Sequence, residues 1–167
     1  EIAYKHRGLD FSAATSSLEM ALWDIQGKLV EKPLCDLLGG DHRAPLPVYA
    51  NIWSDTQWDA ASLTMRASDL VAQGYVAVKI HPMLNHTAPQ AVDVVRHVRD
   101  AIGDDIHLMV DMDSQEDPET SLFVAERIEN YRPYWFEEPV DGQNIVALSR
   151  LRKTTGMRIV TGEKNCG

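Results

Sequence analysis

The sequence predicts an α/β fold in which strands and helices alternate and the strands form one parallel sheet. Two observations support this prediction. From Pro47 onward, short apolar runs alternate with longer amphipathic stretches, which is typical of repeated β–α units. Three of these runs end in an acidic residue at an even spacing: 26 residues separate Asp111 from Glu137, and 26 separate Glu137 from Glu163. A strand, a helix and two short loops need about that length.

Residues 1–45 show no strand pattern and are predicted to be helical. Ser16 and Glu19 have the spacing of a capping box, which predicts the start of a helix. The apolar face of this helix follows at steps of four, three and four, with Leu18, Leu22, Ile25 and Leu29. The pattern breaks near residue 46, where prolines follow, so we expect one domain over residues 1–45 and a second over residues 46–167.

The second domain is predicted to hold five strands, each but the last followed by a helix. The strands are expected at residues 48–52, 75–80, 107–111, 134–137 and 158–163. The helices are expected at residues 57–73, 88–102, from Pro118, and at 143–154. A closed (β/α)8 barrel needs eight strands and typically about 250 residues. The predicted fold is therefore an incomplete (β/α)8 TIM barrel, strands 1–5, and we expect the natural molecule to extend beyond both ends of this chain.

Composition and charge narrow the class of protein. The chain has 167 residues, of which 44% are hydrophobic and 25% charged, as in globular proteins. A net charge of −9 argues against a nucleic-acid-binding surface. No apolar run approaches the roughly 18 residues that span a bilayer, so no membrane partner is expected. Cys35 and Cys166 form no metal or disulfide pattern, which favours a cytoplasmic protein.

The three evenly spaced acids predict a metal site. Parallel strands end at the same edge of their sheet, so the carboxylates of Asp111, Glu137 and Glu163 are expected to converge there. Oxygen ligands alone suit a hard divalent cation, Mg²⁺ before Zn²⁺. A single acid after an apolar strand is more often a helix cap or a solvated loop residue. Three acids at corresponding strand ends instead favour a shared set of metal ligands.

Several short motifs occur in an order known from one family. They are Glu19-Met20-Ala21-Leu22-Trp23-Asp24-Ile25 with Gly27-Lys28, Leu37-Leu38-Gly39-Gly40, Ala77-Val78-Lys79, Val110-Asp111, Trp135-Phe136-Glu137-Glu138-Pro139 and Gly162-Glu163. With these motifs the chain resembles the enolase superfamily, and within it the mandelate racemase-like branch. The resemblance implies that residues 1–45 are the helical end of an α+β capping domain and that the barrel follows. It also implies Mg²⁺ held by Asp111, Glu137 and Glu163.

The chemistry that the resemblance implies is removal of the proton α to a carboxylate, through an enediolate that the metal stabilises. A Lys or His base beside Mg²⁺ is the established arrangement in this superfamily. Lys79 and His81 stand where relatives usually carry Lys-x-Lys, and residues two apart on a strand face the same side. His81 is then the expected base and Lys79 a cation that polarises the substrate carboxylate. His81 is alternatively a residue that only hydrogen-bonds a substrate hydroxyl.

Four further residues are weaker candidates for supporting a ligand or contacting the substrate. Asp113 stands where relatives often carry Asn, and Glu138 is next to an expected ligand. Glu138 could instead pair with a basic neighbour. Asn51 and Trp53 follow the first strand, where lining the pocket and packing under the cap are equally consistent with the sequence.

The expected function is that of an acid-sugar dehydratase acting on a small carboxylate, either an acid sugar or another α-hydroxy or α-amino acid derivative. One alternative is a racemase or epimerase of the same superfamily, although His81 departs from the two-base arrangement of the racemases. The other is an inactive fragment, because the second half of the barrel would carry further catalytic residues. Residues 1–167 alone are expected to be inactive, and the full-length protein is expected to form a homo-oligomer.

Overall fold

The computed structural model of the protein describes residues 8–41, 43–53, 59–114 and 116–165. Contacts between residues divide the chain into two units. One unit contains residues 1–47 together with 163–167, and the other contains residues 48–162. Within the described part of the chain, no helix has the length and apolar character needed to cross a membrane.

The first unit contains helices and no strand among its described residues, as the sequence predicts. It consists of α2 (Leu9–Leu29) and the short α3 (Leu34–Leu37), joined by a tight connection. Gly27 is buried in α2, where an added Cβ would lie 3.0 Å from the Lys32 carbonyl oxygen. The close approach of the returning chain therefore favours glycine at this position.

The predicted helix start at Ser16 and Glu19 is wrong. Both residues lie in the interior of α2, which begins at Leu9 after Gly8. Hydroxyl groups in this part of the helix bond its own backbone, as in the 2.8 Å hydrogen bond that Thr15 Oγ1 donates to the Phe11 carbonyl. Serine and threonine can satisfy their hydroxyls this way inside a helix, so the capping-box spacing alone does not mark a terminus.

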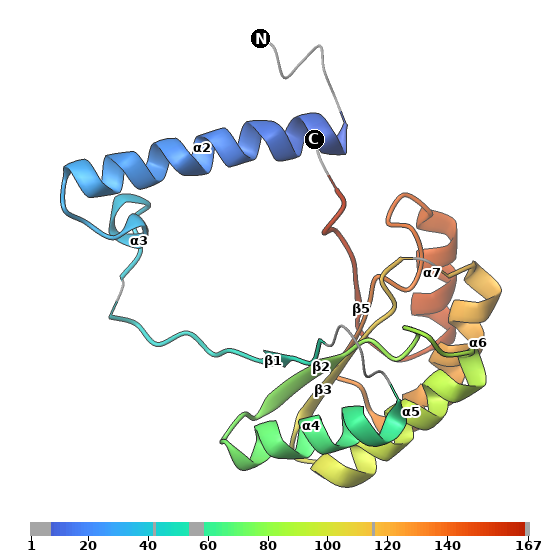
Figure 1. Ribbon diagram of the computed structural model, residues 1–167. Coiled ribbons are helices and arrows are strands. Elements are labelled where there is room, and N and C mark those ends of the chain that lie inside the picture. The colour runs from blue at the N-terminus through green and yellow to red at the C-terminus, as the bar shows by residue number, and fades with distance from the viewer. Residues whose placement is uncertain (1–7, 42, 54–58, 115, 166–167) are drawn as a thin grey trace. The chain divides into compact units, whose positions relative to one another are not determined.

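The second unit is a parallel sheet of five strands in the order β1-β2-β3-β4-β5. The strands are β1 (Ala50–Asn51), β2 (Ala77–Ile80), β3 (His107–Asp111), β4 (Trp135–Glu137) and β5 (Ile159–Val160). The connecting helices are α4 (Ala60–Ala72), α5 (Ala88–Ile102), α6 (Pro118–Ile128) with the 3-10 turn η1 (Glu129–Tyr131), and α7 (Ile145–Thr154). These helices lie along one face of the sheet (Figure 1). The alternation and the parallel pairing confirm the predicted fold class.

Local signals explain why some element bounds match the prediction closely. Thr87 and Gln90 form a true capping box at the start of α5, and Gly103 ends the helix with a φ of 76°. Asp117 caps α6 by accepting from backbone N–H groups of its first turn, directly before Pro118. The bounds expected for α5 and the start expected for α6 are therefore confirmed.

Several elements are shorter than expected, namely β1, β2, β4, β5, α4 and α7, and two of them show a local reason. The fifth strand contains only Ile159–Val160, because its pairing with β4 extends over just these two residues. Helix α4 begins at Ala60, after the Asp59 side chain caps it by accepting from the backbone N–H of Ser62. The expected start at residue 57 falls in residues 54–58, which lie outside the described part of the chain.

The core lies between the sheet and its helices. Side chains of the strands that point toward the helices are fully buried, among them Ile80, Leu108 and Phe136. They pack against apolar faces of the helices, such as Val94 and Val98 of α5. Burial of this face fixes the register of each strand, and the register in turn fixes which residues stand at the carboxyl ends.

One buried arginine ties together the opposite, amino-terminal ends of the central strands. Arg99 of α5 donates to four backbone carbonyls, at 2.9 Å to Tyr131, 2.8 Å to Gly103, 2.7 Å to Ile106 and 3.2 Å to Arg132. The residue is only 6% exposed. Its guanidinium thereby donates to carbonyl groups of the segments that precede β3 and β4.

Candidate active site

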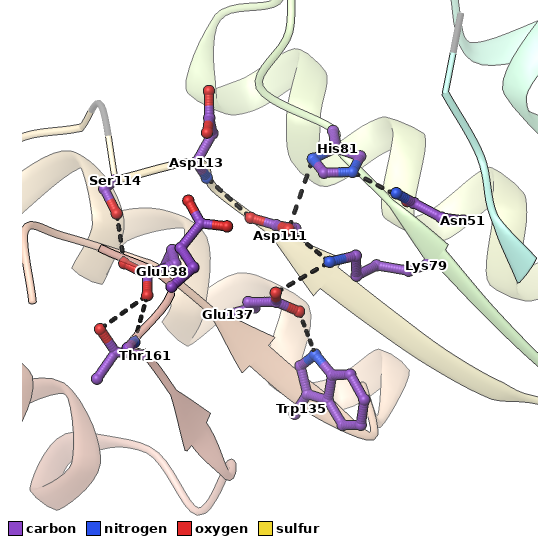
Figure 2. A network of polar contacts seen from close by, with 12 residues as sticks. Asn51, Lys79, His81, Asp111, Asp113, Ser114, Trp135, Glu137, Glu138 and Thr161 are labelled. Atoms are coloured by element: carbon purple, nitrogen blue, oxygen red, sulfur yellow. Dashed lines mark hydrogen bonds and ion pairs between the residues drawn. The ribbon is translucent and has the colours of Figure 1, made fainter. Parts of the chain in front are cut away.

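Charged side chains meet at the carboxyl ends of three neighbouring strands. Lys79 comes from β2, Asp111 from β3 and Glu137 from β4. Asp111 and Glu137 are direct partners across the β3–β4 pairing, so the sheet register brings their side chains side by side. Figure 2 shows the three side chains pointing toward one another. The sheet thus assembles a cluster that the strand-end spacing predicted in part.

Lys79 bridges the two carboxylates. Its Nζ lies 2.9 Å from Asp111 Oδ2 and 2.9 Å from Glu137 Oε1. The side chains of Lys79, Asp111 and Glu137 are only 9%, 5% and 14% exposed. Burial alone lowers the pKa of Lys79, but its hydrogen bonds and charge attraction to the two carboxylates outweigh burial and raise it above the ordinary value. Lys79 is therefore a cation held between two anions.

Each carboxylate also accepts a hydrogen bond on its other oxygen. The backbone N–H of Asp113 donates to Asp111 Oδ1 at 3.0 Å. The indole Nε1–H of Trp135 donates to Glu137 Oε2 at 2.8 Å. Asp113 has a φ of 58°, in the left-handed region, so the chain turns directly after β3. Both carboxylates are therefore held on two sides.

His81 lies beside this cluster and is 6% exposed. Its Nε2 is 3.0 Å from Asn51 Oδ1, and its Nδ1 is 3.7 Å from Asp111 Oδ2 (Figure 2). The ring packs edge-on against Trp53, with centroids 4.9 Å apart. The structure therefore places Asn51 and Trp53, two of the weaker candidates, directly around the imidazole.

The surroundings of His81 favour its neutral form. Burial lowers its pKa below the ordinary value, and the charge of Lys79 acts in the same direction, while Asp111 opposes them. Within the described residues, Nδ1 is buried and has no hydrogen-bond partner. The acceptor Asn51 Oδ1 next to Nε2 is consistent with a proton on Nε2, which leaves the lone pair on Nδ1.

His81 also lines a small pocket of about 30 Å³. It is lined by His81, Met83, Leu84, Asp111, Met112, Asp113 and Glu116. The volume suits a water-sized group rather than a whole substrate. Its position shows that His81 and Asp111 face a common space.

Glu138 lies at the same end of the sheet but in a different network. Its carboxylate is 1% exposed and accepts hydrogen bonds from the Ser114 hydroxyl, from Thr161 Oγ1 at 3.0 Å and from the Gly162 N–H at 2.6 Å. Its backbone has a φ of 43°, which turns the side chain of Glu138 away from that of Glu137. Glu138 therefore links the segments that follow β3 and β5.

Glu163 belongs to the first contact unit, whereas Asp111 and Glu137 belong to the second. Its side chain is exposed and lies 3.6 Å from Lys164 Nζ. In the described part of the chain, no three His, Cys, Asp or Glu side chains are grouped to hold a metal ion. The role of Glu163 as a third ligand stays a prediction from its spacing.

Sequence reasoning missed the polar role of Trp135. Strand alternation places Trp135 and Glu137 on one face, which is a sufficient signal for proximity. It gives no sign that the indole would donate to the carboxylate. Ser114 and Thr161 were missed for a similar reason, since their partner Glu138 is distant in sequence from both.

A lysine, a histidine and two carboxylates gathered at the carboxyl edge of a parallel sheet are typical of the active-site end of a (β/α) barrel. Comparison with known proteins gives the family. Residues 62–167 match the family described as "Enolase C-terminal domain-like". Residues 2–39 match "Mandelate racemase / muconate lactonizing enzyme, N-terminal domain". The chain therefore belongs to the enolase superfamily, in its mandelate racemase and muconate lactonizing enzyme branch.

Three relatives illustrate the similarity. A D-gluconate dehydratase of Thermoproteus tenax is 33% identical over 165 residues, covering 95% of this chain and 33% of that protein. The crystal structure of an enolase from the environmental genome shotgun sequencing of the Sargasso Sea is 40% identical, with a TM-score of 0.85. It covers 99% of this chain and 44% of its own. The crystal structure of a 3,6-anhydro-D-galactonate cycloisomerase from Zobellia galactanivorans is 30% identical with a TM-score of 0.86, covering 98% and 45%.

These relatives agree with the predicted fold and chemistry at a coarse level. They are enolase superfamily proteins, and two of them are named as a dehydratase and a cycloisomerase of acid sugars or their derivatives. This chain spans between about a third and a half of their lengths. The incomplete barrel predicted from the sequence is confirmed.

Proposed function

We propose that the full natural protein is an acid-sugar dehydratase that removes the proton α to the substrate carboxylate and expels the β-hydroxyl as water. The observation that supports this most directly is the position of His81, a buried imidazole 3.7 Å from Asp111 and next to the Lys79 cation. The similarity to a D-gluconate dehydratase supports the same reaction class.

His81 is the proposed base. A neutral imidazole at pH 7 can accept a proton, and burial keeps His81 neutral. His81 and Asp111 line one common space, and the α-carbon of a bound substrate would approach Nδ1 from that side. Asn51 would hold the ring in place through Nε2, and the Trp53 contact would limit its rotation.

Lys79 is the proposed binding group for the substrate carboxylate. It stays positively charged because Asp111 and Glu137 raise its pKa. Negative charge moves onto the substrate carboxylate when the α-proton leaves, and a fixed ammonium next to it favours that change. Loss of the β-hydroxyl then gives an enol, which becomes a 2-keto-3-deoxy acid.

Asp111, Glu137 and Glu163 are the proposed ligands of Mg²⁺. The fit rests on Lys79: a single cationic nitrogen lies 2.9 Å from one oxygen of Asp111 and 2.9 Å from one oxygen of Glu137. Two carboxylate oxygens thus already converge on one positive charge, and the donor set is all oxygen, as Mg²⁺ requires. When bound, Mg²⁺ would supply further stabilisation of the negative charge on the substrate carboxylate.

Two weaker candidates have proposed supporting roles. Asp113 would fix Asp111 through its backbone N–H, and its side chain lines the pocket beside His81. Glu138 would hold the ends of β3 and β5 in place through its network with Ser114, Thr161 and Gly162. Neither residue is proposed to move a proton.

The test is to incubate the full natural protein with Mg²⁺ and D-gluconate and to measure the 2-keto-3-deoxy acid formed. We expect activity, and we expect its loss in His81→Asn. A second candidate is a cycloisomerase, favoured by the similarity to the Zobellia galactanivorans enzyme. Incubation with 3,6-anhydro-D-galactonate separates the two, since isomerisation releases no water. Turnover of neither an open-chain acid sugar nor an anhydro sugar acid would refute the proposed substrate class.

A further inference from the structure

The two carboxylates next to Lys79 share one pattern of contacts. In each, one oxygen faces the Lys79 ammonium: Asp111 Oδ2 and Glu137 Oε1, both at 2.9 Å. The other oxygen of each accepts from an N–H group, which is the Asp113 backbone for Asp111 and the Trp135 indole for Glu137. Figure 2 shows these contacts on opposite sides of the carboxylates. Each carboxylate therefore has one oxygen on the ammonium and the other on an N–H donor.

We propose that Trp135 is a positioning residue, whose indole N–H holds Oε2 of Glu137 and thereby directs Oε1 to the bound cation. The inference rests on the proposed function in one respect, since it takes Glu137 to be a ligand of Mg²⁺. It extends that function by assigning a role to a residue outside the expected ligand and base set.

The geometry of β4 explains why Trp135 can hold Glu137. The two residues are two apart on one strand, so their side chains lie on the same face. A glutamate side chain has three rotatable bonds, and its carboxylate samples several orientations unless it is bonded on more than one side. The 2.8 Å contact to an indole N–H removes that freedom, because the indole has no acceptor and can only donate.

The indole itself is held by neighbouring rings. Its ring packs edge-on against Tyr49, with centroids 5.7 Å apart, and at a tilt against Tyr134, with centroids 5.5 Å apart. Across the sheet, Trp135 pairs with Met109 of β3, which is 1% exposed. A ring confined in this way presents its N–H in one direction.

The alternative is that Trp135 only packs against the tyrosines. Trp135→Phe separates the two roles, because phenylalanine keeps an aromatic ring and removes the N–H donor. Loss of a residue that orients a metal ligand typically weakens metal affinity about 10–100-fold. Loss of packing alone would lower stability and leave the affinity of the folded protein for Mg²⁺ unchanged.

The experiment measures binding of Mg²⁺ alone to the full natural protein by isothermal titration calorimetry. We expect Trp135→Phe and Glu137→Gln each to weaken affinity about 10-fold or more. We expect the double variant to bind no more weakly than Glu137→Gln, because Trp135 acts through Glu137. Trp23→Phe, in the other contact unit, is the matched control and should bind as the unaltered protein does.

Each deviation has a defined meaning. Unchanged affinity in Trp135→Phe with weakened affinity in Glu137→Gln overturns the role of Trp135 and leaves the proposed function intact. Unchanged affinity in Glu137→Gln overturns the proposed ligand set, and the inference with it. Additive losses in the double variant also overturn the inference, since Trp135 would then act independently of Glu137.

A second measurement uses the unaltered protein without added metal. The protein is labelled with ¹⁵N at the indole nitrogens, and exchange of the indole protons with solvent is followed by NMR. We expect the Trp135 Nε1–H, bonded at 2.8 Å to a carboxylate that is 14% exposed, to exchange far more slowly than that of Trp23. Exchange of the Trp135 proton as fast as that of Trp23 would overturn the hydrogen bond and the inference.

Discussion

Substitution of Lys79 by methionine should destabilise the protein in a way that Mg²⁺ reverses. The substitution keeps an unbranched side chain of similar length and removes the charge. Asp111 and Glu137 would then lie close together with no cation between them, at 5% and 14% exposure. Like charges that lose their common partner in a buried site repel each other and lack solvation.

The magnitude follows from burial. Removing one partner of a buried ion pair typically costs about 3–5 kcal/mol, against about 0.2–1 kcal/mol for an exposed pair. With Lys79 9% exposed and two contacts at 2.9 Å, the buried figure applies. Mg²⁺ that binds only the folded state stabilises a protein by about 2.7 kcal/mol at 100 times the dissociation constant. Without the competing ammonium, Lys79→Met should bind Mg²⁺ more tightly than the Lys28→Met control and gain more stability from the same Mg²⁺ concentration.

The assay is urea unfolding of the full natural protein with and without Mg²⁺. The matched control is Lys28→Met, which breaks the exposed Lys28–Asp24 pair, with side chains 75% and 61% exposed, and should cost less than about 1 kcal/mol. The reasoning is refuted if Lys79→Met is no less stable than Lys28→Met. It is also refuted if Mg²⁺ stabilises Lys79→Met no more than it stabilises the control.

Three further predictions concern residues around the sheet. Arg99→Met should lower the free energy of unfolding by about 3 kcal/mol or more, because four carbonyls lose their donor. Substitution of the half-exposed Arg96 by methionine is the control and should change it little. Equal urea midpoints for the two variants would contradict this prediction. Glu138→Gln should lower the free energy of unfolding by about 1–3 kcal/mol, because an amide NH₂ cannot accept from the donors that bond the carboxylate. An unchanged unfolding curve would rule out the network. Burial lowers the pKa of His81, so the unfolded chain binds the proton more readily than the folded protein. The free energy of unfolding should therefore fall as pH drops through about 6.5, and His81→Asn should flatten that dependence. An identical pH profile of stability in both proteins would disprove this prediction.

The sequence predicts the strand–helix framework well because its signals are local. Thr87, Gln90 and Gly103 bound α5 through contacts within a few residues, and the bounds expected for this helix match the structure. The start of α2 could not be found in the same way. Its Ser and Thr residues suit either a cap or a helix interior, and the choice depends on how far the helix extends upstream.

The candidate site was predictable in its members and much less so in their contacts. Even spacing and strand alternation place Asp111, Glu137 and Lys79 at one sheet edge. That Lys79 would bridge both acids depends on the strand register and on side-chain torsions, which a sequence pattern does not determine. The indole donor of Trp135 escaped prediction for the same reason.

The α-proton itself tests the account most directly. The full natural protein is incubated with Mg²⁺ and D-gluconate in D₂O, and ¹H NMR follows deuterium entering the α position of the substrate and its conversion to the keto acid. With His81 as the base, His81→Asn should lose both processes at least about 100-fold while Mg²⁺ affinity stays unchanged. Exchange or turnover at the parental rate in His81→Asn would contradict the assignment of His81 and the mechanism built on it.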